Sequence, residues 1–468
     1  MYVLSYAQIS SASLIDEINA FKNEQQKYQK QFTQKLESVK NENKKLAEKI
    51  NSFEDKVIHE QRISQSSDLN ADTQIESISK SETINVYQET LSGRVYSDSD
   101  FDDLTAFKGN SVSSQVPLNL IKGRNRFDDH ALVFGGFFEI DGVKAWGDSF
   151  NASTGDARST QDYSSGIALN ATVITFDVMS NINKWLQAYL TISSFDLSNP
   201  GIRNAFVTFG NLKESPFFFT IGKNRIPLMS GGGTSPYMAG LNAGYFRPLW
   251  RTNALFGYYD HGLNANFSYI QPESSNNDDP NFMASIFYNN KFGQSDIGYS
   301  LVLAYLYNIA DMGMAVDKVA RTDPVTGATS ITTRQDDNSL FNTQGTLSYK
   351  EYSLLGGWIT LLKDKSYTDN RRANSWYIQT IYSPVLWDRK TSFGLTYGQA
   401  YNVENFFFPL AGRSGFGLAV QGVEEQIMAY IQRPILSPQV LGAIEFGWFG
   451  LYDNQRTAHL TLDLNISF

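Results

Sequence analysis

The chain has 468 residues, enough for two or three average domains or for one large barrel. It contains no cysteine, which excludes thiolate metal sites and cysteine nucleophiles. The formal net charge of −9 gives no reason to expect nucleic-acid binding, and aromatic residues reach 14%, a high share for a soluble domain. No run of about eighteen apolar residues is present, so a helical membrane protein is not expected.

Residues 1–7 resemble the end of a signal peptide. Ser5 and Ala7 are small residues at the spacing of a cleavage site, immediately before Gln8. The basic part and most of the apolar part of such a leader do not precede them. We therefore expect a leader longer than the one shown, with an ordinary short N-terminus as the alternative.

Residues 8–63 are expected to form a periplasmic coiled-coil helix. From Leu14 onward the segment is rich in Lys, Glu and Gln, lacks Pro and Gly, and spaces its apolar residues by alternating steps of four and three. Gln25 and Asn43 occupy two of the core positions, and one irregular step follows Tyr28. Such a helix needs a partner, and a second copy is the simplest one, which leads us to expect a homotrimer. A single helix lying against the periplasmic end of a barrel remains the alternative.

Residues 64–128 are rich in Ser, Asp, Asn and Thr, for example at Ser97–Asp103. This composition is typical of a linker. Part of the segment could instead fold inside a barrel as a partial plug, and the sequence leaves both alternatives open.

Residues 129–468 alternate apolar and polar side chains in repeated stretches. The last stretch is the most regular: Leu460, Leu462 and Leu464 fall on one face, while Thr461 and Asp463 fall on the other. About sixteen such segments begin near residues 131, 166, 184, 203, 215, 245, 263, 280, 296, 341, 352, 373, 389, 424, 439 and 456. The pattern predicts an all-β transmembrane barrel of about 16 antiparallel strands.

The connections between these segments alternate between short and long. The long ones are predicted at 142–164, 227–244, 309–340 and 402–423. Membrane barrels have short periplasmic turns and long extracellular loops. With an even strand count, both ends of the barrel lie in the periplasm, together with the N-terminal coiled coil.

No catalytic constellation is visible. The four histidines (His59, His130, His261 and His459) are scattered without metal-ligand spacing, and no nucleophile elbow or phosphate-binding loop occurs. We therefore expect no enzymatic activity, no resident metal and no cofactor.

The hairpin Arg203–Arg225 and the loop that follows it are the most informative part of the barrel. The loop Met229–Gly240 is rich in glycine and contains no carboxylate, as expected of a loop that turns back into a crowded lumen. The candidate pore-lining residues around it are four cations and two aromatics: Lys223, Arg225, Arg247, Arg251, Tyr237 and Tyr245. Cations at a constriction favour an anion. The alternative is that these residues lie at the rim or at the membrane interface, since a register shift of one residue exchanges the two faces.

The segment Thr208–Lys223, together with the N-terminal coiled coil and the terminal Phe468, resembles the siderophore porin family related to the legiobactin receptor of Legionella. The resemblance implies a porin-like barrel that imports a ferric siderophore of the polycarboxylate type, without the globular plug of energised receptors. It also implies that the barrel assembly machinery reads the final Phe468. No binding residue is transferred from the family, so the site residues depend on charge alone.

The leading hypothesis is therefore an outer-membrane channel or receptor for a small anionic solute, most simply a ferric siderophore. A general or sugar-specific trimeric porin is the alternative within transport. A structural outer-membrane anchor for the periplasmic coiled coil is the alternative from another class, although an anchor needs few strands. The expected partners are outer-membrane lipid, the barrel assembly machinery and the solute.

Overall fold

The computed structural model describes residues 30, 85–88, 115–124, 127–153, 160–195, 199–229, 233–247, 250–271, 281–293, 295–310, 312–314, 316, 318–322, 329–333, 338–363, 371–409 and 419–468. The chain divides into two units, residues 1–81 and 82–468. Apart from Lys30, the signal-like residues 1–7 and the predicted coiled coil of residues 8–63 lie outside the described residues.

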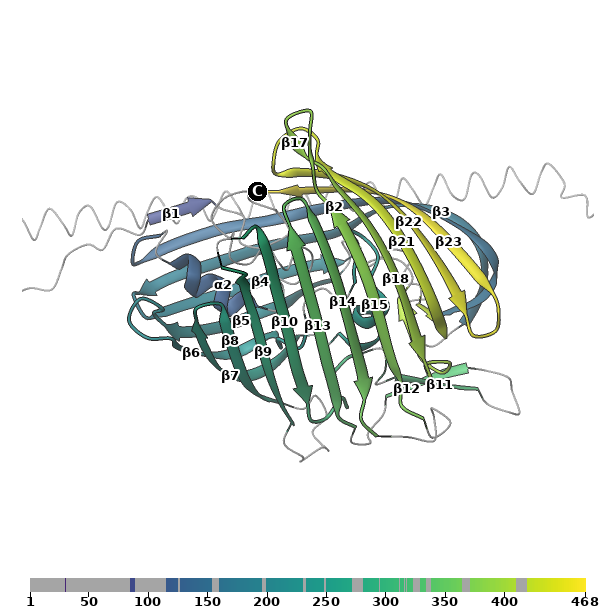
Figure 1. Ribbon diagram of the computed structural model, residues 1–468, viewed down its shortest axis with the longest axis horizontal. Coiled ribbons are helices and arrows are strands. Elements are labelled where there is room, and N and C mark those ends of the chain that lie inside the picture. Colours follow the sequence, from purple (N-terminus) through teal and green to yellow (C-terminus); the bar gives the residue numbers. More distant parts are fainter. Residues whose placement is uncertain are drawn as a thin grey trace, which may run out of the picture. The chain divides into compact units, whose positions relative to one another are not determined.

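Sixteen strands of the second unit form one closed antiparallel barrel, so the predicted fold is confirmed (Figure 1). Each strand pairs with its predecessor, and the last strand closes the barrel on the first, with Asp463 opposite Asp141. The predicted starts fall at or near these strands. In order they are β2 (Ala131–Ser153), β3 (Thr160–Asn183), β4 (Leu186–Phe195), β5 (Asn199–Gly210), β6 (Phe217–Arg225), β7 (Trp250–Asp260), β8 (Leu263–Ile270), β9 (Asn281–Lys291), β10 (Ile297–Leu306), β13 (Leu340–Tyr349), β14 (Tyr352–Leu361), β15 (Asn374–Tyr382), β18 (Ser392–Tyr401), β21 (Val423–Pro434), β22 (Val440–Leu451) and β23 (Arg456–Ser467).

Shorter elements complete the described part of the chain. β1 (Asn85–Gln88) runs parallel to the first residues of β2, and β20 (Ala419–Gln421) pairs with both β19 (Phe407–Pro409) and the end of β2. Two further hairpins join β11 (Lys318–Thr322) to β12 (Thr329–Thr333) and β16 (Val385–Leu386) to β17 (Arg389–Lys390). The two helices are α2 (Val116–Gly123) and α3 (Leu241–Phe246). Among the described residues, no helix has the length and apolar character needed to cross a membrane.

Short turns and longer connections alternate along the barrel. The turn between β7 and β8 consists of His261 and Gly262, both at positive φ (46° and 82°), as a tight two-residue hairpin turn requires. At the opposite end, 24 residues separate β6 from β7 (226–249). This alternation agrees with the sequence pattern.

The predicted long connection at 142–164 is wrong. Most of it belongs to β2 and β3, which stay paired as far as Ser153 and Thr160 and leave only 154–159 between them. These strands have 23 and 24 residues, about twice the length needed to cross a membrane. Two register shifts accommodate irregularities along this pair of strands. Where the two strands extend beyond the membrane, polar residues are compatible with strand structure. The polar composition of residues 142–164 therefore marks the ends of two long strands and not a loop.

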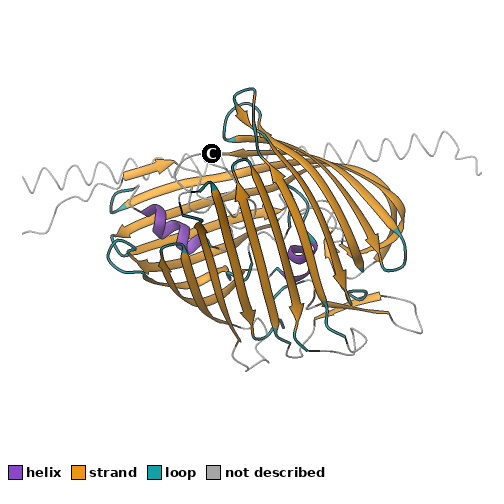
Figure 2. Ribbon diagram, viewed as in Figure 1, coloured by secondary structure: helices purple, strands orange, loops and turns teal. Residues whose placement is uncertain are grey.

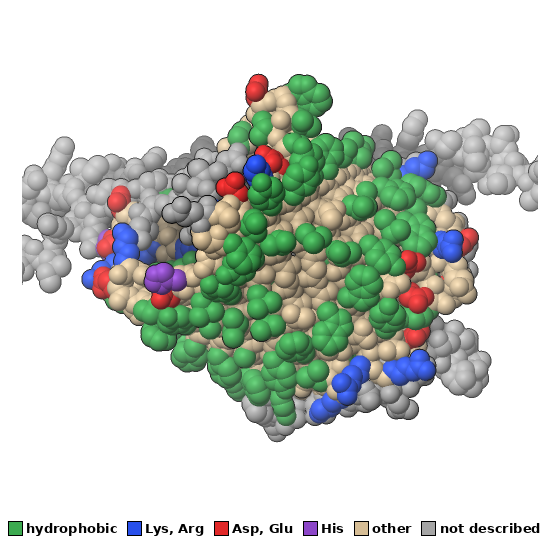
Figure 3. All heavy atoms as spheres, viewed as in Figure 1, with side chains coloured by type: hydrophobic (Ala, Val, Ile, Leu, Met, Phe, Trp, Pro, Cys, Tyr) green, Lys and Arg blue, Asp and Glu red, His purple; other side chains and the backbone are tan. Residues whose placement is uncertain are grey.

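The two faces of the strands differ as the alternation predicts. On β23, Leu460 and Leu462 are 39% and 56% exposed, whereas Thr461 between them is fully buried. Figure 3 shows hydrophobic side chains spread over the strands and charged side chains gathered at the edges of the barrel. An apolar outer surface of this kind is what a lipid bilayer covers. The polar face of β23 therefore lines the interior.

Candidate functional site: the barrel lumen

The lumen is crossed by the connection between β6 and β7. We call residues 226–247 the inner loop; its residues 230–232 are not described. Although the loop leaves and rejoins neighbouring strands, its hydrogen bonds reach other strands of the wall. The side-chain amides of Asn342 on β13 and Gln379 on β15 donate to the carbonyl oxygens of Leu228 (2.9 Å) and Thr234 (3.0 Å). The Gln426 amide on β21 donates to the Ala239 carbonyl (2.8 Å). The inner loop therefore spans the barrel and narrows it.

Glu445 on β22 holds the inner loop most directly. Its fully buried carboxylate accepts hydrogen bonds from Ser235 Oγ (2.5 Å) and from the backbone N–H groups of Tyr237 (3.0 Å) and Met238 (2.8 Å). A carboxylate acceptor makes stronger hydrogen bonds than a neutral one. This side chain fixes the middle of the inner loop against the wall.

Apolar packing holds the second half of the inner loop. On α3, the Tyr245 hydroxyl donates to the Val423 carbonyl (3.0 Å) and accepts from the Val423 N–H (2.8 Å). Its ring centroid lies 5.2 Å from that of Phe408. A Cβ on Gly244 would come within 2.1 Å of the same Phe408 ring, so the close approach requires glycine there. The loop is part of the main apolar core, which lies inside the barrel.

A second segment, α2, lies inside the barrel at the end that carries the short turns (Figure 2). Leu118 and Ile121 pack against Phe218 and Leu255 on the inner faces of β6 and β7. Lys122 Nζ donates to the Tyr259 hydroxyl (3.0 Å), and Arg124 Nε donates to the Asn183 carbonyl (3.2 Å). This helix belongs to the segment 64–128, for which the sequence left a linker and a partial plug open.

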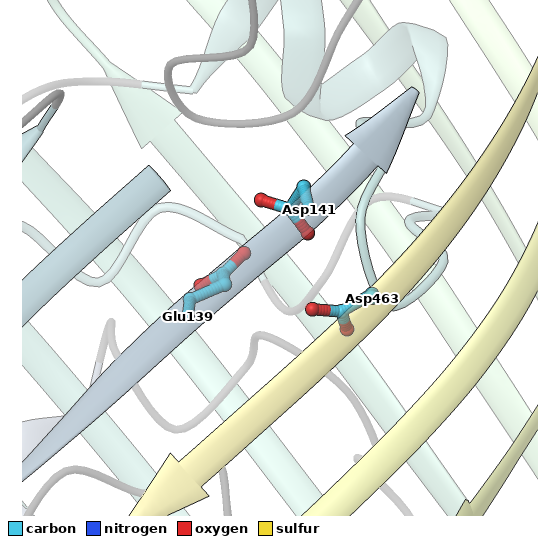
Figure 4. A group of neighbouring side chains, drawn as sticks. All are labelled: Glu139, Asp141 and Asp463. Carbon is cyan, nitrogen blue, oxygen red and sulfur yellow. The ribbon is translucent and has the colours of Figure 1, made fainter. Parts of the chain in front are cut away.

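Three buried carboxylates meet on the lumen wall where the barrel closes (Figure 4). Glu139 and Asp141 on β2 and Asp463 on β23 are 1%, 0% and 6% exposed, and their carboxylate oxygens all lie within 4.8 Å of one another. The phenol of Tyr237, on the inner loop, is in electrostatic contact with all three. Burial raises the pKa of Tyr237 well above its usual value, and the charges of Asp141 and Glu139 raise it further.

The structure separates the candidate residues into two groups. Tyr237 and Tyr245 lie in the lumen, buried in the inner loop. By alternation, Lys223 and Arg225 fall on the face of β6 that carries the exposed Phe217, which is the outer face, but Arg225 at the end of the strand is only 6% exposed. The Arg225 guanidinium lies 4.0 Å from the centroid of the Trp250 ring, and the Arg203 guanidinium lies 4.3 Å from the same ring.

The two remaining cations lie at the second half of the inner loop and the start of β7. Arg247 follows α3, and its N–H donates to the Ala243 carbonyl (3.3 Å). Arg251 shares the face of β7 that carries the buried Asn253, and its guanidinium donates to the Trp250 carbonyl (3.1 Å). Phe468 exchanges two backbone hydrogen bonds with Gly136, at 2.9 and 3.0 Å.

Sequence reasoning placed Asp463 on the polar face of the last strand but proposed no carboxylate as a site residue. Glu139, Asp141, Glu445 and Asp463 all lie in the phase of their strand that faces the lumen. An acidic residue in the lumen-facing phase of a strand could therefore have been noticed in the sequence. The sequence could not show that three of the four carboxylates come together, because this depends on closure of the barrel.

Comparisons of the chain with solved structures give only weak similarities. No curated protein matches it. Solved structures that resemble it are OmpT of Vibrio cholerae (12% identity, TM-score 0.46, 72% of this chain and 97% of that chain), the outer membrane channel DcaP of Acinetobacter baumannii (10%, 0.45, 72% and 97%) and the anion-selective porin from Comamonas acidovorans (11%, 0.47, 72% and 99%). These similarities are too low to transfer a function.

The family assignment comes from the sequence comparison. A family model, "Protein of unknown function (DUF3573)", matches residues 3–327, which is more than half of the 468 residues. The chain belongs to the DUF3573 family.

Proposed function

We propose that the protein is a channel of the bacterial outer membrane for a small solute. The observation that carries this proposal is the closed barrel of sixteen strands, apolar outside and polar inside, with a loop fixed across its lumen. A membrane anchor needs few strands, because it encloses nothing. A loop held across the lumen narrows the pore. The width and the lining of this constriction then determine which solutes can pass.

The solute we propose first is a ferric siderophore, which the resemblance of the Thr208–Lys223 segment implies. We propose Arg247 and Arg251 as the groups that meet it, since they belong to the inner loop and to the inward face of β7, whereas Tyr237 is buried within the loop. Lys223 lies on the outer face, and we propose an interfacial role for it, whereas Arg225 is buried against the ring of Trp250. Tyr245 serves the packing of the loop through its two bonds to Val423.

A sugar or another neutral solute is the second candidate, for a specific reason. The inward faces of β7 to β10 carry several amide and hydroxyl side chains, among them Asn253, Asn264, Asn266, Ser268, Ser285 and Ser300. Such groups exchange hydrogen bonds with sugar hydroxyls without requiring charge. The homotrimer expected from the N-terminal heptads suits either solute and remains a prediction.

Growth under iron limitation tests the siderophore. A deletion strain should lose growth on a purified ferric polycarboxylate siderophore and regain it with the intact gene. Unimpaired siderophore-dependent growth of the deletion strain would contradict a ferric siderophore as the solute. A neutral solute would then be the remaining candidate.

Planar-bilayer recording tests the channel itself and its charge preference. We expect openings whose anion preference falls when Arg247→Gln and Arg251→Gln are combined, because two lumen cations are lost. The control Lys223→Gln neutralises an outward cation and should leave selectivity unchanged. Absence of openings in the unchanged protein and in all of these variants would indicate an anchor.

A further inference from the structure

We propose that Glu139, Asp141 and Asp463, together with the hydroxyl of Tyr237, form a binding site for a hard divalent cation on the lumen wall. The site does not depend on which solute passes through the barrel. It lies where β2 and β23 meet, and Figure 4 shows the side chain of Asp463 directed from β23 towards Asp141 and Glu139 on β2.

The spacing of the carboxylates fits one shared ion. All three offer an oxygen within 4.8 Å of the others. Two ligands that each lie about 2.4 Å from a calcium ion can be at most about 4.8 Å apart, so every pair of these carboxylates meets the separation that a shared ion requires. The positions are fixed by the barrel itself, since Asp141 and Asp463 are direct partners across the closing pair of strands.

An independent observation comes from the inner loop. The Tyr237 side chain is 4% exposed, and its hydroxyl has no hydrogen-bond partner in the part of the chain that the structure describes. Beyond the effect of burial, the charges of Asp141, Glu139, Glu445 and Asp463 all raise the pKa of this hydroxyl, those of Asp141 and Glu139 most strongly, as expected of a hydroxyl that faces the cluster. Its backbone is held by Glu445, so the ring cannot simply turn towards solvent. A buried hydroxyl left without a partner is costly, and an ion beside the three acids gives it one.

The chemistry of the donors selects the class of ion. Carboxylates and a hydroxyl are hard oxygen ligands, which suit Ca²⁺, Mg²⁺ or Mn²⁺ better than the softer metals. Three carboxylates this close repel one another when all are ionised, and a divalent ion between them offsets that repulsion. The ion would also link Tyr237 on the loop to β2 and β23, and so help to hold the loop in place.

The test uses the full-length protein in detergent after treatment with a chelator. Titration calorimetry with CaCl₂, MgCl₂ and MnCl₂ should show one site per chain for at least one of these ions. Asp141→Asn and Asp463→Asn should each weaken binding by tenfold or more, and Tyr237→Phe by a few-fold. The matched control is Glu214→Gln, which removes an exposed carboxylate in the turn between β5 and β6 and should bind as the unchanged protein does.

Three outcomes overturn the site. The first is the absence of binding by all three ions, and the second is equal binding by the unchanged protein and the two Asn variants. The third is an equal loss of binding in Glu214→Gln, because binding would then reflect general surface charge. Heat-modifiable migration in gels shows whether each barrel has folded. If the Asn variants do not fold, the test is made on the unchanged protein and Tyr237→Phe instead, by measuring the emission of bound Tb³⁺ excited through tyrosine. It should fall in Tyr237→Phe and be displaced by Ca²⁺; unchanged emission in Tyr237→Phe contradicts the proposal.

Discussion

The two segments inside the barrel are held in different ways. The inner loop is continuous with β6 and β7 at its two ends, is fixed by Glu445 in its middle, and belongs to the main apolar core. α2 packs through a few apolar side chains into two small clusters and adds polar contacts at Lys122 and Arg124. Local stability follows the amount of buried apolar surface and the number of satisfied polar groups. We therefore expect the inner loop to stay fixed to the wall, and α2 to be the segment that leaves its position at the lower cost in free energy.

The largest expected effect comes from the packing of the inner loop. Phe408 is fully buried between Tyr245 and Phe449, with ring centroids 5.2 and 6.0 Å away. Phe408→Ala should lower stability by about 3–5 kcal/mol, because it leaves a cavity that the rigid barrel cannot fill. The temperature at which the barrel loses its folded migration in gels measures this. Phe217→Ala, on the outer face and 64% exposed, is the control. A similar drop in this temperature in both variants would show that the apolar core does not hold the inner loop.

The next effect concerns Glu445. Glu445→Gln keeps the shape of the side chain but leaves one of its three hydrogen bonds unmade or reversed, which should cost about 1–3 kcal/mol. We expect larger or noisier single-channel conductance, since the middle of the loop is released into the lumen. The control is Glu425→Gln on the neighbouring strand, whose carboxylate accepts from the Tyr397 hydroxyl. Identical recordings from both variants would mean that Glu445 does not set the constriction.

The same contrast explains what the sequence could predict. Alternation with a period of two is a local signal, so Leu460, Thr461 and Leu462 reveal both the strand and its faces. The partner of Glu445 is Ser235, 210 residues away, and only closure of the barrel brings them together. No local pattern contains that pairing.

The face of Lys223 was harder to assign for a different reason. Its strand begins with Phe217, Phe218 and Phe219, so the alternation is visible only from Thr220 and Ile221 onward. A shift of one residue then exchanges lumen and outer face, and the cations of this strand could be assigned to either. The structure places Lys223 on the same face as Phe217 and Ile221.

The smallest expected effect concerns the polar contact of α2. Lys122 Nζ lies 3.0 Å from the Tyr259 hydroxyl and 4.6 Å from the centroid of its ring. Lys122→Met keeps the length of the side chain and removes the charge, which should weaken docking of α2 by about 0.5–1 kcal/mol. Because α2 is held by two small apolar clusters and only a few polar contacts, this change should raise the frequency of openings several-fold while leaving the unfolding temperature of the barrel unchanged. Lys213→Met, an exposed lysine at the same end, is the control. A lowered unfolding temperature without more openings would show that α2 supports the barrel and does not occlude it.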